Sequence, residues 1–174
     1  MTAPSASTLL LQNGRVIDPA NTLDRPADLL IRDGRIAQIE DRIDPPPGAE
    51  TIDVTGNLVV PGLIDMHVHF RDPGFPEKET LQTGCQAAAA GGFTAVACLP
   101  NTDPPTDTPE VVRYILDRAG SADARVYPIA CATVKMAGRE IADIEALLNA
   151  GAVGFSDDGL PIGSEDIMRE LLRR

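Results

Sequence analysis

From Pro61 onward, short apolar segments alternate with amphipathic ones, and this alternation constrains the fold more than any other feature of the sequence. Apolar runs of strand length followed by segments with helical periodicity predict successive β/α units. The predicted strands span 63–69, 93–98, 125–130 and 153–155, and the predicted helices span 78–90, 109–118, 139–150 and a segment that begins near Glu165 with Ser164 as N-cap. Strands joined by helices lie parallel in one sheet, so we predict an α/β fold, either doubly wound or a barrel.

Polar side chains gather where these strands end. His67, His69 and Arg71 lie at the end of the first, Asn101 follows the second, and Asp158 follows the fourth. No GxGxxG or GxxxxGK[ST] motif follows any strand, which disfavours the nucleotide-binding open sheets. In a β/α barrel the C-terminal ends of the strands surround one site. The distribution therefore favours a barrel.

The length of this region limits how much of a barrel it can form. A (β/α)8 barrel takes about 250 residues, whereas residues 61–174 supply only four β/α units. We therefore predict that residues 61–174 form the first half of a TIM-type barrel, and that the chain is a fragment or one part of a larger assembly.

Residues 1–60 have a different pattern, with short apolar runs separated by turn residues. Asn13-Gly14 and Asp33-Gly34 each lie between such runs, and both pairs supply the positive φ that two-residue hairpins need. The proline-rich segment 44–48 excludes a helix or strand interior there. We predict a separate antiparallel unit over residues 1–60, an N-terminal β-sandwich segment.

Composition excludes several classes of protein. The net charge of −11, without clustered Lys or Arg, disfavours nucleic acid as a partner. The sequence has neither an apolar run of about 18 residues nor a basic and apolar leader, so we expect no membrane association and a cytoplasmic location. Cys85, Cys98 and Cys131 are odd in number and widely spaced within apolar stretches, which predicts buried thiols rather than disulfides.

His67 and His69 are the only histidines of the chain. On a strand, side chains at positions i and i+2 point to the same side, so both imidazoles can meet at one metal ion, and imidazole suits zinc. Asp158 could reach the same ion across a barrel mouth. If the strand persists to this point, Asp157 and Asp158 point to different sides, so we expect only one of them to bind metal. The alternative interpretation is two ordinary polar residues at a strand end and a solvated acidic turn.

Two further side chains are candidates for binding an anionic substrate. Arg71 offers a planar fork of donors that suits a carboxylate, and Asn101 offers a neutral amide. Taken singly, Arg71 could instead form a surface ion pair with a neighbouring acid, and Asn101 could cap a turn between prolines.

The segment from Pro61 to Gly74, PGLIDMHVHFRDPG, resembles the signature of the dihydroorotases in the cyclic amidohydrolase superfamily. The first part of this signature identifies only the superfamily, whereas HFRDPG together with PNT and DDG is typical of the long bacterial, type I enzymes. The matching segments, in the same order and spacing, are 78–80 (KET), 91–94 (GGFT), 100–102 (PNT) and 157–159 (DDG).

The resemblance implies a distorted β/α barrel with a small β-sandwich and one or two Zn2+ ions. It implies that His67 and His69 bind one zinc and that Asp158 is a carboxylate ligand able to bridge to a second. Asp158 stands where many relatives carry a carboxylated lysine, so no lysine modification is inferred. It also implies that His69, Arg71 and Asn101 contact the substrate, with Arg71 and Asn101 holding its carboxylate.

The implied reaction is the reversible, zinc-dependent cyclisation of N-carbamoyl-L-aspartate to L-dihydroorotate in pyrimidine biosynthesis. The resemblance places the proton-shuttling aspartate and two more histidine ligands after later barrel strands, beyond Arg174. No catalytic residue is therefore assigned within this segment. We expect the 174 residues to be inactive alone and to need a C-terminal half, and we expect a homo-oligomer or a complex with aspartate transcarbamoylase.

Two other functions remain open. One is another cyclic amidohydrolase, such as an allantoinase or a hydantoinase, which Arg71 disfavours because it suits a substrate carboxylate. The other is a non-catalytic dihydroorotase-like partner of aspartate transcarbamoylase, against which the retention of both histidines and Asp158 argues.

Overall fold

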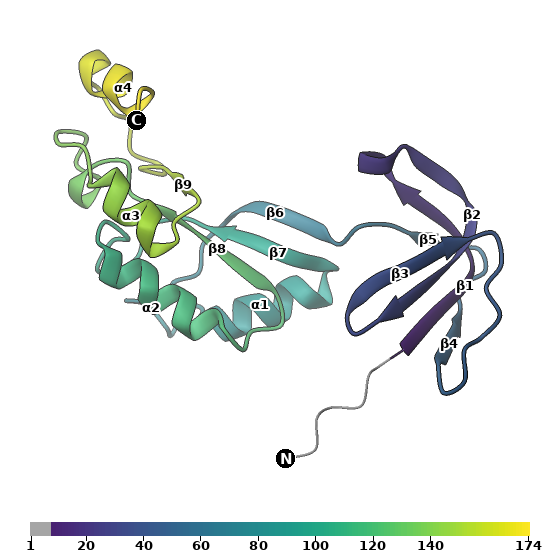
Figure 1. Cartoon of the computed structure of the whole chain (residues 1–174). Coiled ribbons are helices and arrows are strands. Elements are labelled where there is room, and N and C mark those ends of the chain that lie inside the picture. Colours follow the sequence, from purple (N-terminus) through teal and green to yellow (C-terminus); the bar gives the residue numbers. More distant parts are fainter. Residues whose placement is uncertain (1–7) are drawn as a thin grey trace. The chain divides into compact units, whose positions relative to one another are not determined.

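A computed structural model describes residues 8–174 of the chain, which divide into two compact units between Pro61 and Gly62 (Figure 1). The first unit is a β-sheet and the second alternates strands with helices. Among the residues described, no helix is both long and apolar enough to cross a bilayer.

The first unit is a single five-stranded sheet in which β2 lies between β1 and β3. β1 pairs antiparallel with β2, and β2 with β3, whereas β4 and β5 pair with β1 in parallel. The antiparallel arrangement predicted for this unit thus holds for three strands only, and its place in a β-sandwich stays a prediction. The elements are β1 (Thr8–Asp18), a 3-10 helix (Pro19–Asn21), β2 (Leu23–Arg32), β3 (Arg35–Glu40), β4 (Glu50–Asp53) and β5 (Leu58–Val59).

The predicted hairpin at Asn13-Gly14 is wrong. β1 runs through both residues, and its register with β2 shifts between Leu11 and Gly14, which marks a bulge. Asn13 has a φ of 65°, and its N–H donates to Asp28 over 2.9 Å instead of to a ladder partner. Positive φ serves a bulge as well as a turn, so the dipeptide alone does not distinguish them. The hairpin at Asp33-Gly34 is correct and joins β2 to β3.

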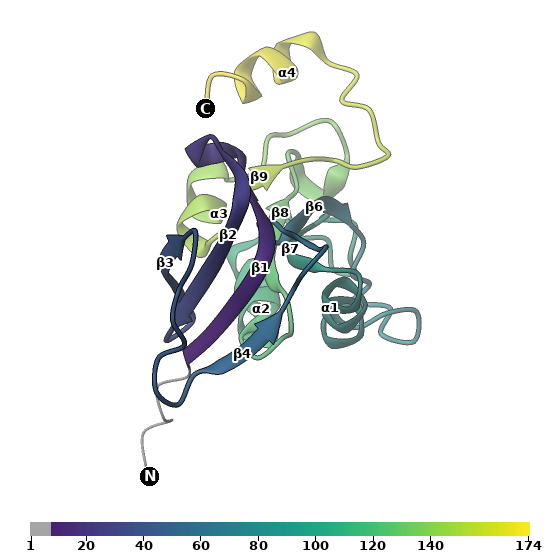
Figure 2. The same ribbon diagram turned by 90° about the vertical axis from the view of Figure 1, so that its right-hand side faces the viewer.

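The second unit contains a parallel sheet with the strand order β6-β7-β8-β9 (Figure 2). This is the four-stranded parallel sheet predicted for a partial barrel. Its strands are β6 (Leu63–Val68), β7 (Phe93–Cys98), β8 (Arg125–Ala130) and β9 (Gly154–Phe155). The helices are α1 (Leu81–Ala90), α2 (Pro109–Ala119), α3 (Ile144–Ala150) and α4 (Glu165–Leu171), with a 3-10 turn at Val134–Met136.

Capping side chains explain where the helices begin. α1 begins at Leu81 rather than at residue 78, because the Thr80 hydroxyl accepts the N–H of Thr83 and ends the preceding extended segment. α3 begins at Ile144 rather than at residue 139, because Asp143 caps it. Ser164 caps α4 as predicted.

The core of the second unit lies between the sheet and helices α1 and α2. Leu81 of α1, Val96 of β7 and Ile115 of α2 are almost fully buried within it. The three cysteines are buried and form no disulfide, as predicted. Burial raises the pKa of Cys98 and of Cys131 to about 12, so both thiols stay protonated at neutral pH.

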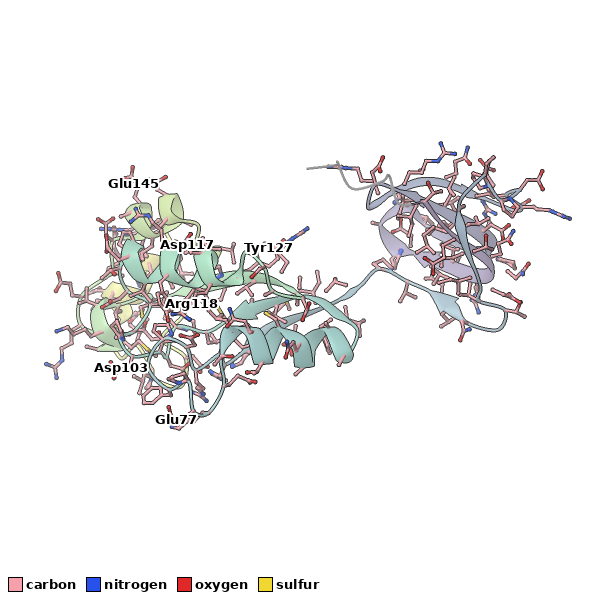
Figure 3. The ribbon with its side chains drawn as sticks, turned by 90° about the horizontal axis from the view of Figure 1, so that it is seen from below. Glu77, Asp103, Asp117, Arg118, Tyr127 and Glu145 are labelled. Carbon is pink, nitrogen blue, oxygen red and sulfur yellow. The ribbon has the colours of Figure 1, made fainter. Side chains whose placement is uncertain are left out.

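Several acidic side chains of the second unit are instead found at its surface. Glu77, Asp103, Asp117 and Glu145 are all exposed (Figure 3). Water solvates these carboxylates, so they impose little desolvation penalty on the stability of the fold.

Phe70 anchors the chain directly after β6, between His69 and Arg71. Its ring is 4% exposed and packs in the core against α1. A Cβ at Gly84 would lie 2.2 Å from the Phe70 ring, so the glycine leaves the space that the ring fills. The packing of Phe70 on α1 therefore fixes the backbone that carries both neighbouring polar residues.

We expect Gly84→Ala to destabilise the second unit. Alanine improves helix propensity by about 1 kcal/mol, but overpacking a core costs about 1–3 kcal/mol, and the buried Phe70 ring has little room to move. The matched control is Gly120→Ala, because Gly120 has a helical φ of −61° and space for a methyl group. Urea unfolding should show lower stability for Gly84→Ala alone; equal or higher stability than wild type contradicts the packing argument.

Asp28 plays an anchoring role in the first unit. Its carboxylate is 3% exposed and accepts hydrogen bonds from the N–H groups of Asn13 and Ile43 and from the Gln12 amide. Burial raises the pKa of Asp28, but these donors outweigh burial and hold the pKa below its usual value. The charged carboxylate therefore stabilises the fold above pH about 4, and this stability is lost as pH falls through the lowered pKa.

We expect Asp28→Asn to cost about 1–3 kcal/mol of stability at pH 7, because the amide cannot accept from all three donors. The loss of wild-type stability below pH about 4 should also become shallower in the variant. Urea unfolding at several pH values measures both effects. Asp33→Asn, at an exposed turn position that tolerates asparagine, is the control. Unchanged stability in Asp28→Asn would argue against the anchoring role.

Candidate metal centre

His67 and His69 lie at the C-terminal end of β6, where a bulge interrupts the strand. The four residues of β6 from Asp65 to Val68 lie opposite the three residues of β7 from Val96 to Cys98. The N–H of His67 donates to the Asp65 carboxylate over 3.0 Å instead of to a strand partner. The two imidazole rings are 5.1 Å apart between centroids and inclined by 74°. The predicted convergence of the two rings is therefore present in the structure.

Asp158, in the turn after β9, completes this group. Its Oδ1 lies 3.3 Å from His67 Nε2, and its Oδ2 lies 3.5 Å from His69 Nε2. Ligand atoms of all three residues lie within 4.8 Å of one another. The Asp158 side chain is 20% exposed and that of His67 is 60% exposed, so the group is open to solvent on the His67 side.

The donor set suits a zinc ion. Zinc binds imidazole nitrogen at about 2.0–2.1 Å and carboxylate oxygen at about 2.0–2.2 Å in tetrahedral geometry, which separates neighbouring ligand atoms by about 3.3–3.5 Å. The two nitrogen–oxygen distances, 3.3 and 3.5 Å, match this separation but end on different oxygens of Asp158, and one ligand atom from each of the three residues lies within 4.8 Å of the others. Three protein ligands would leave a fourth position open, as catalytic zinc sites do. The same contacts without a cation would be two His–Asp ion pairs.

Asn101 lies beside this group and contacts two of its members. His69 Nδ1 lies 2.9 Å from Asn101 Oδ1, and Asn101 Nδ2 donates to Asp158 Oδ2 over 3.5 Å. Because an amide oxygen only accepts, His69 Nδ1 carries a proton, and Nε2 is the ring nitrogen that faces Asp158 and could bind a metal ion. The sequence suggested a turn or a substrate contact for Asn101; the structure adds a role in orienting His69.

Arg71 lies two residues beyond His69 and is half-buried. Within residues 8–174 its guanidinium has no ion pair or hydrogen bond, so the surface ion pair considered from the sequence is absent there. The neighbouring Asp72 is buried and accepts a hydrogen bond from the Tyr114 hydroxyl over 2.7 Å. This bond ties the loop that carries Arg71 to α2. Arg71 is therefore close to the His67–His69–Asp158 group along the chain, but the structure shows no hydrogen bond or ion pair between its guanidinium and that group.

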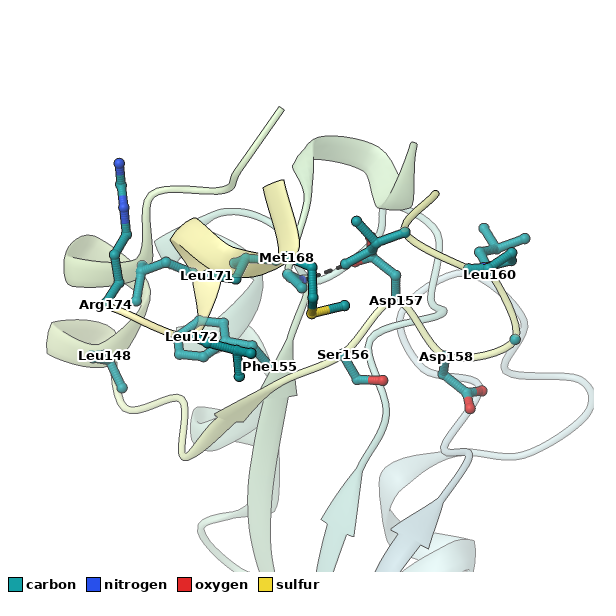
Figure 4. Close-up of a pocket in the computed structure, with 15 residues that line it drawn as sticks. Leu148, Phe155, Ser156, Asp157, Asp158, Leu160, Met168, Leu171, Leu172 and Arg174 are labelled. Carbon is teal, nitrogen blue, oxygen red and sulfur yellow. Dashed lines mark hydrogen bonds between the residues drawn. The ribbon is translucent and has the colours of Figure 1, made fainter. Parts of the chain in front are cut away.

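Asp157 has a structural role that the sequence did not identify. It is 6% exposed and accepts the N–H groups of Ala132 and Thr133 over 2.9 and 3.0 Å. Figure 4 marks a hydrogen bond at Asp157 with a dashed line and shows the Asp158 carboxylate pointing away from it. The available signal was the alternation of side chains along a strand, which predicts opposite directions but not the partners.

A cavity of about 650 Å3 adjoins the same turn, between β9, α3 and α4 (Figure 4). It is lined mainly by apolar side chains, among them Phe155, Leu160 and Met168, and neither histidine lines it. Asp158 does line it, so the cavity adjoins the His67–His69–Asp158 group on the Asp158 side.

Comparison with known proteins places the chain in a family. Residues 56–174 match the model of the "Dihydro-orotase-like" family. The chain is 50% identical over 165 residues to a protein named dihydroorotase from Solibacter usitatus, covering 94% of this chain and 38% of that protein. It is 48% identical over 164 residues to the dihydroorotase of Streptococcus pneumoniae, covering 94% of this chain and 39% of that protein. The chain thus spans less than two fifths of the length of these relatives.

Solved structures support the same assignment. The L-hydantoinase of Arthrobacter aurescens superposes with a TM-score of 0.77 at 26% identity, over 94% of this chain and 37% of that one. A D-hydantoinase from a Thermus species superposes with a TM-score of 0.58 at 30% identity, over 71% and 27%. The resemblance seen in the sequence motifs, the parallel sheet and these matches agree: the chain belongs to the dihydro-orotase-like family of cyclic amidohydrolases.

Proposed function

We propose that this chain is the N-terminal part of a zinc-dependent dihydroorotase that interconverts N-carbamoyl-L-aspartate and L-dihydroorotate. The observation that carries the proposal is the placement of His67, His69 and Asp158 around one point, with one ligand atom from each within 4.8 Å of the others. The relatives named dihydroorotase, at 50% and 48% identity, support the substrate class. The hydantoinases resemble the chain less, at 26% and 30% identity.

His67, His69 and Asp158 would hold the zinc ion. Zinc, when bound, supplies Lewis acidity that polarises a carbonyl group and lowers the pKa of a water molecule toward neutrality. The chain itself contributes the alignment of the donor atoms. Asn101 keeps the Nε2 lone pair of His69 directed at the site, and the bulge at Asp65 directs the His67 ring.

Arg71 is the candidate for recognising the substrate carboxylate. Its guanidinium is free of partners within the described part of the chain, so its donors are available to a ligand. A planar guanidinium binds a carboxylate through two parallel hydrogen bonds. Dihydroorotate carries such a carboxylate, which is the specific observation that favours it over uncharged cyclic amides. The loop contact between Asp72 and Tyr114 would hold Arg71 in place.

The reaction also needs a group that transfers a proton to the leaving nitrogen, and we assign no residue of this segment to that role. The family members matched here are more than twice as long as this chain. We propose that the remaining length supplies the proton-transfer aspartate, further ligands and the other barrel strands. The chain then acts as half of a site, and its partner is that C-terminal part. A dihydroorotase-like partner of aspartate transcarbamoylase without activity is the alternative, and an intact metal centre argues against it.

We expect the chain to bind Zn2+ or Co2+, with His67→Ala and Asp158→Ala each weakening the affinity by at least about 100-fold, more than the effect of losing an outer-shell partner. Competition with a chromophoric chelator measures the affinity, and the visible spectrum of Co2+ reports tetrahedral coordination. Asp117→Ala removes an exposed carboxylate outside the centre and is the control. If wild type binds no better than His67→Ala, the contacts are ion pairs and not a metal centre.

We expect turnover of dihydroorotate when this chain is joined to the C-terminal part of the Solibacter usitatus dihydroorotase, and none from this chain alone. In the joined protein, Arg71→Met should lower kcat/KM by about 10–100-fold, because a charge-assisted hydrogen bond contributes about 1.5–3 kcal/mol. Zinc affinity should stay unchanged. Arg113→Met, on the exposed face of α2, is the matched control. A joined protein that binds zinc and hydrolyses hydantoins but not dihydroorotate would favour the hydantoinase alternative.

A further inference from the structure

The turn that carries Asp158 has few hydrogen bonds of its own to fix it. β9 consists of only two residues, Gly154 and Phe155, which pair with the end of β8. Beyond it, the N–H of Ser156 donates to Ala130 over 2.9 Å, and that of Leu160 donates to Asp157 over 2.8 Å. Such a short ladder leaves the direction of the following side chains weakly determined, yet Asp158 must face two imidazoles at once.

Asp157 supplies what the short strand lacks. Its Oδ1 accepts the N–H groups of both Ala132 and Thr133, and its Oδ2 accepts the Thr133 hydroxyl. All three donors belong to the segment that directly follows β8. The side chain therefore fastens the end of β9 to the end of its neighbour, one residue before Asp158.

The segment that Asp157 grips is itself held in an uncommon conformation. Lys135 and Met136 have φ values of 54° and 56°, in the left-handed region that non-glycine residues rarely adopt. The Lys135 N–H donates to Asp107 over 2.8 Å, and the Thr133 hydroxyl also accepts the N–H of Gly138 over 2.8 Å. Backbone in this region persists only where surrounding contacts determine it. The segment that Asp157 binds is thus held in place by hydrogen bonds of its own, independent of Asp157.

We propose that Asp157 is a positioning residue for the metal centre: by fastening the β9 turn to the Ala132–Thr133 segment, it directs the adjacent Asp158 carboxylate at His67 and His69. The N–H of Leu160 donates to the Asp157 carbonyl oxygen over 2.8 Å, so Asp158 is the second residue of the turn that Asp157 begins. Fixing Asp157 therefore fixes the start of this turn and the backbone that carries the Asp158 side chain. This inference rests on the proposed metal-binding function, and ligand atoms held within about 0.5 Å are what such a function needs.

A carboxylate is required for this contact, and neither its amide nor its truncation can replace it. Both oxygens of Asp157 only accept, and they meet three donors, two backbone N–H groups and one hydroxyl. Asparagine would turn an N–H2 group toward one of these donors and lose at least one bond. The turn would then be free to rotate about its remaining backbone contacts.

The competing explanation is that Asp157 merely stabilises the fold, and Asp28 provides the control that separates the two. Asp28 is equally buried, at 3% against 6% exposed, and likewise accepts two backbone N–H groups and one side-chain donor. It lies in the first unit, whereas the candidate ligands belong to the second. A purely structural role predicts that both asparagine variants lose stability and neither changes zinc affinity.

The experiment compares zinc affinity in wild type, Asp157→Asn and Asp28→Asn, with circular dichroism to show that each is folded. We expect Asp157→Asn to bind zinc about 10–100-fold more weakly, the usual effect of losing a partner that orients a ligand, and Asp28→Asn to bind as wild type does. Amide hydrogen exchange at Ala132 and Thr133 in metal-free protein should also accelerate only in Asp157→Asn.

Thr133→Val removes one of the three donors and serves where Asp157→Asn does not fold. It should weaken zinc binding by less than Asp157→Asn, and Thr133→Ser should restore it. Unchanged affinity in Asp157→Asn, or in Thr133→Val where that variant takes its place, overturns the positioning role, as does equal weakening in Asp28→Asn. Failure of wild type to bind zinc overturns instead the metal centre itself, so the two failures are distinguishable.

Discussion

The parallel direction of the strands in the second unit is the constraint on which the rest of the site depends. Parallel strands bring their carboxyl ends to one edge of the sheet, so residues far apart in sequence meet there. His67 lies near the end of β6 and His69 directly after it, Asn101 follows β7, and Asp158 follows β9. His67 and His69 are close to each other along the chain, but Asn101 and Asp158 are distant from them and from one another. Their contacts exist because α1, α2 and α3 return the chain to the same end of each new strand.

The edge of the sheet brings these residues together only approximately, and local contacts complete the alignment. A bulge at Asp65 sets His67, the packing of Phe70 against Gly84 sets the backbone around His69, and Asn101 orients the His69 ring. Each contact is made by a residue next to a candidate ligand or on the neighbouring strand. The precision of the site thus comes from partners that do not themselves face the ion.

The sequence predicted the parts of this fold that depend on periodicity and on pairs of turn residues. The four strands and α2 lie close to their predicted bounds, because buried apolar runs and an amphipathic stripe are local signals. Asn13-Gly14 was misread as a hairpin, because positive φ is common to turns and bulges and only the long-range bond to Asp28 separates them. Helix starts were misplaced where Thr80 and Asp143 cap later than periodicity suggests.

For the site, the motif predicted which residues meet but not how they are held. The HxH motif at the end of the first strand and Asp158 after the fourth lie at the same edge of a parallel sheet, so their convergence could be predicted. The bridging contacts of Asn101 and the grip of Asp157 on Thr133 could not, because both depend on loop conformations set by tertiary contacts. The family motifs PNT and DDG include Asn101 and Asp157, but they do not indicate the physical role of Asp157.

The partners of the carboxylates distinguish anchoring residues from a ligand. Asp28 and Asp157 are buried, and each accepts hydrogen bonds from two backbone N–H groups and one side-chain donor. These hydrogen bonds take the place of water around the two carboxylates. Asp158 is more exposed and accepts no backbone N–H within the described residues; its neighbours are two imidazole nitrogens and the Asn101 amide. Where the facing imidazole nitrogens keep their lone pairs, all three groups direct electron density at one point. A metal ion at that point would accept these lone pairs and balance the carboxylate charge, whereas without one only protonated imidazoles could balance that charge.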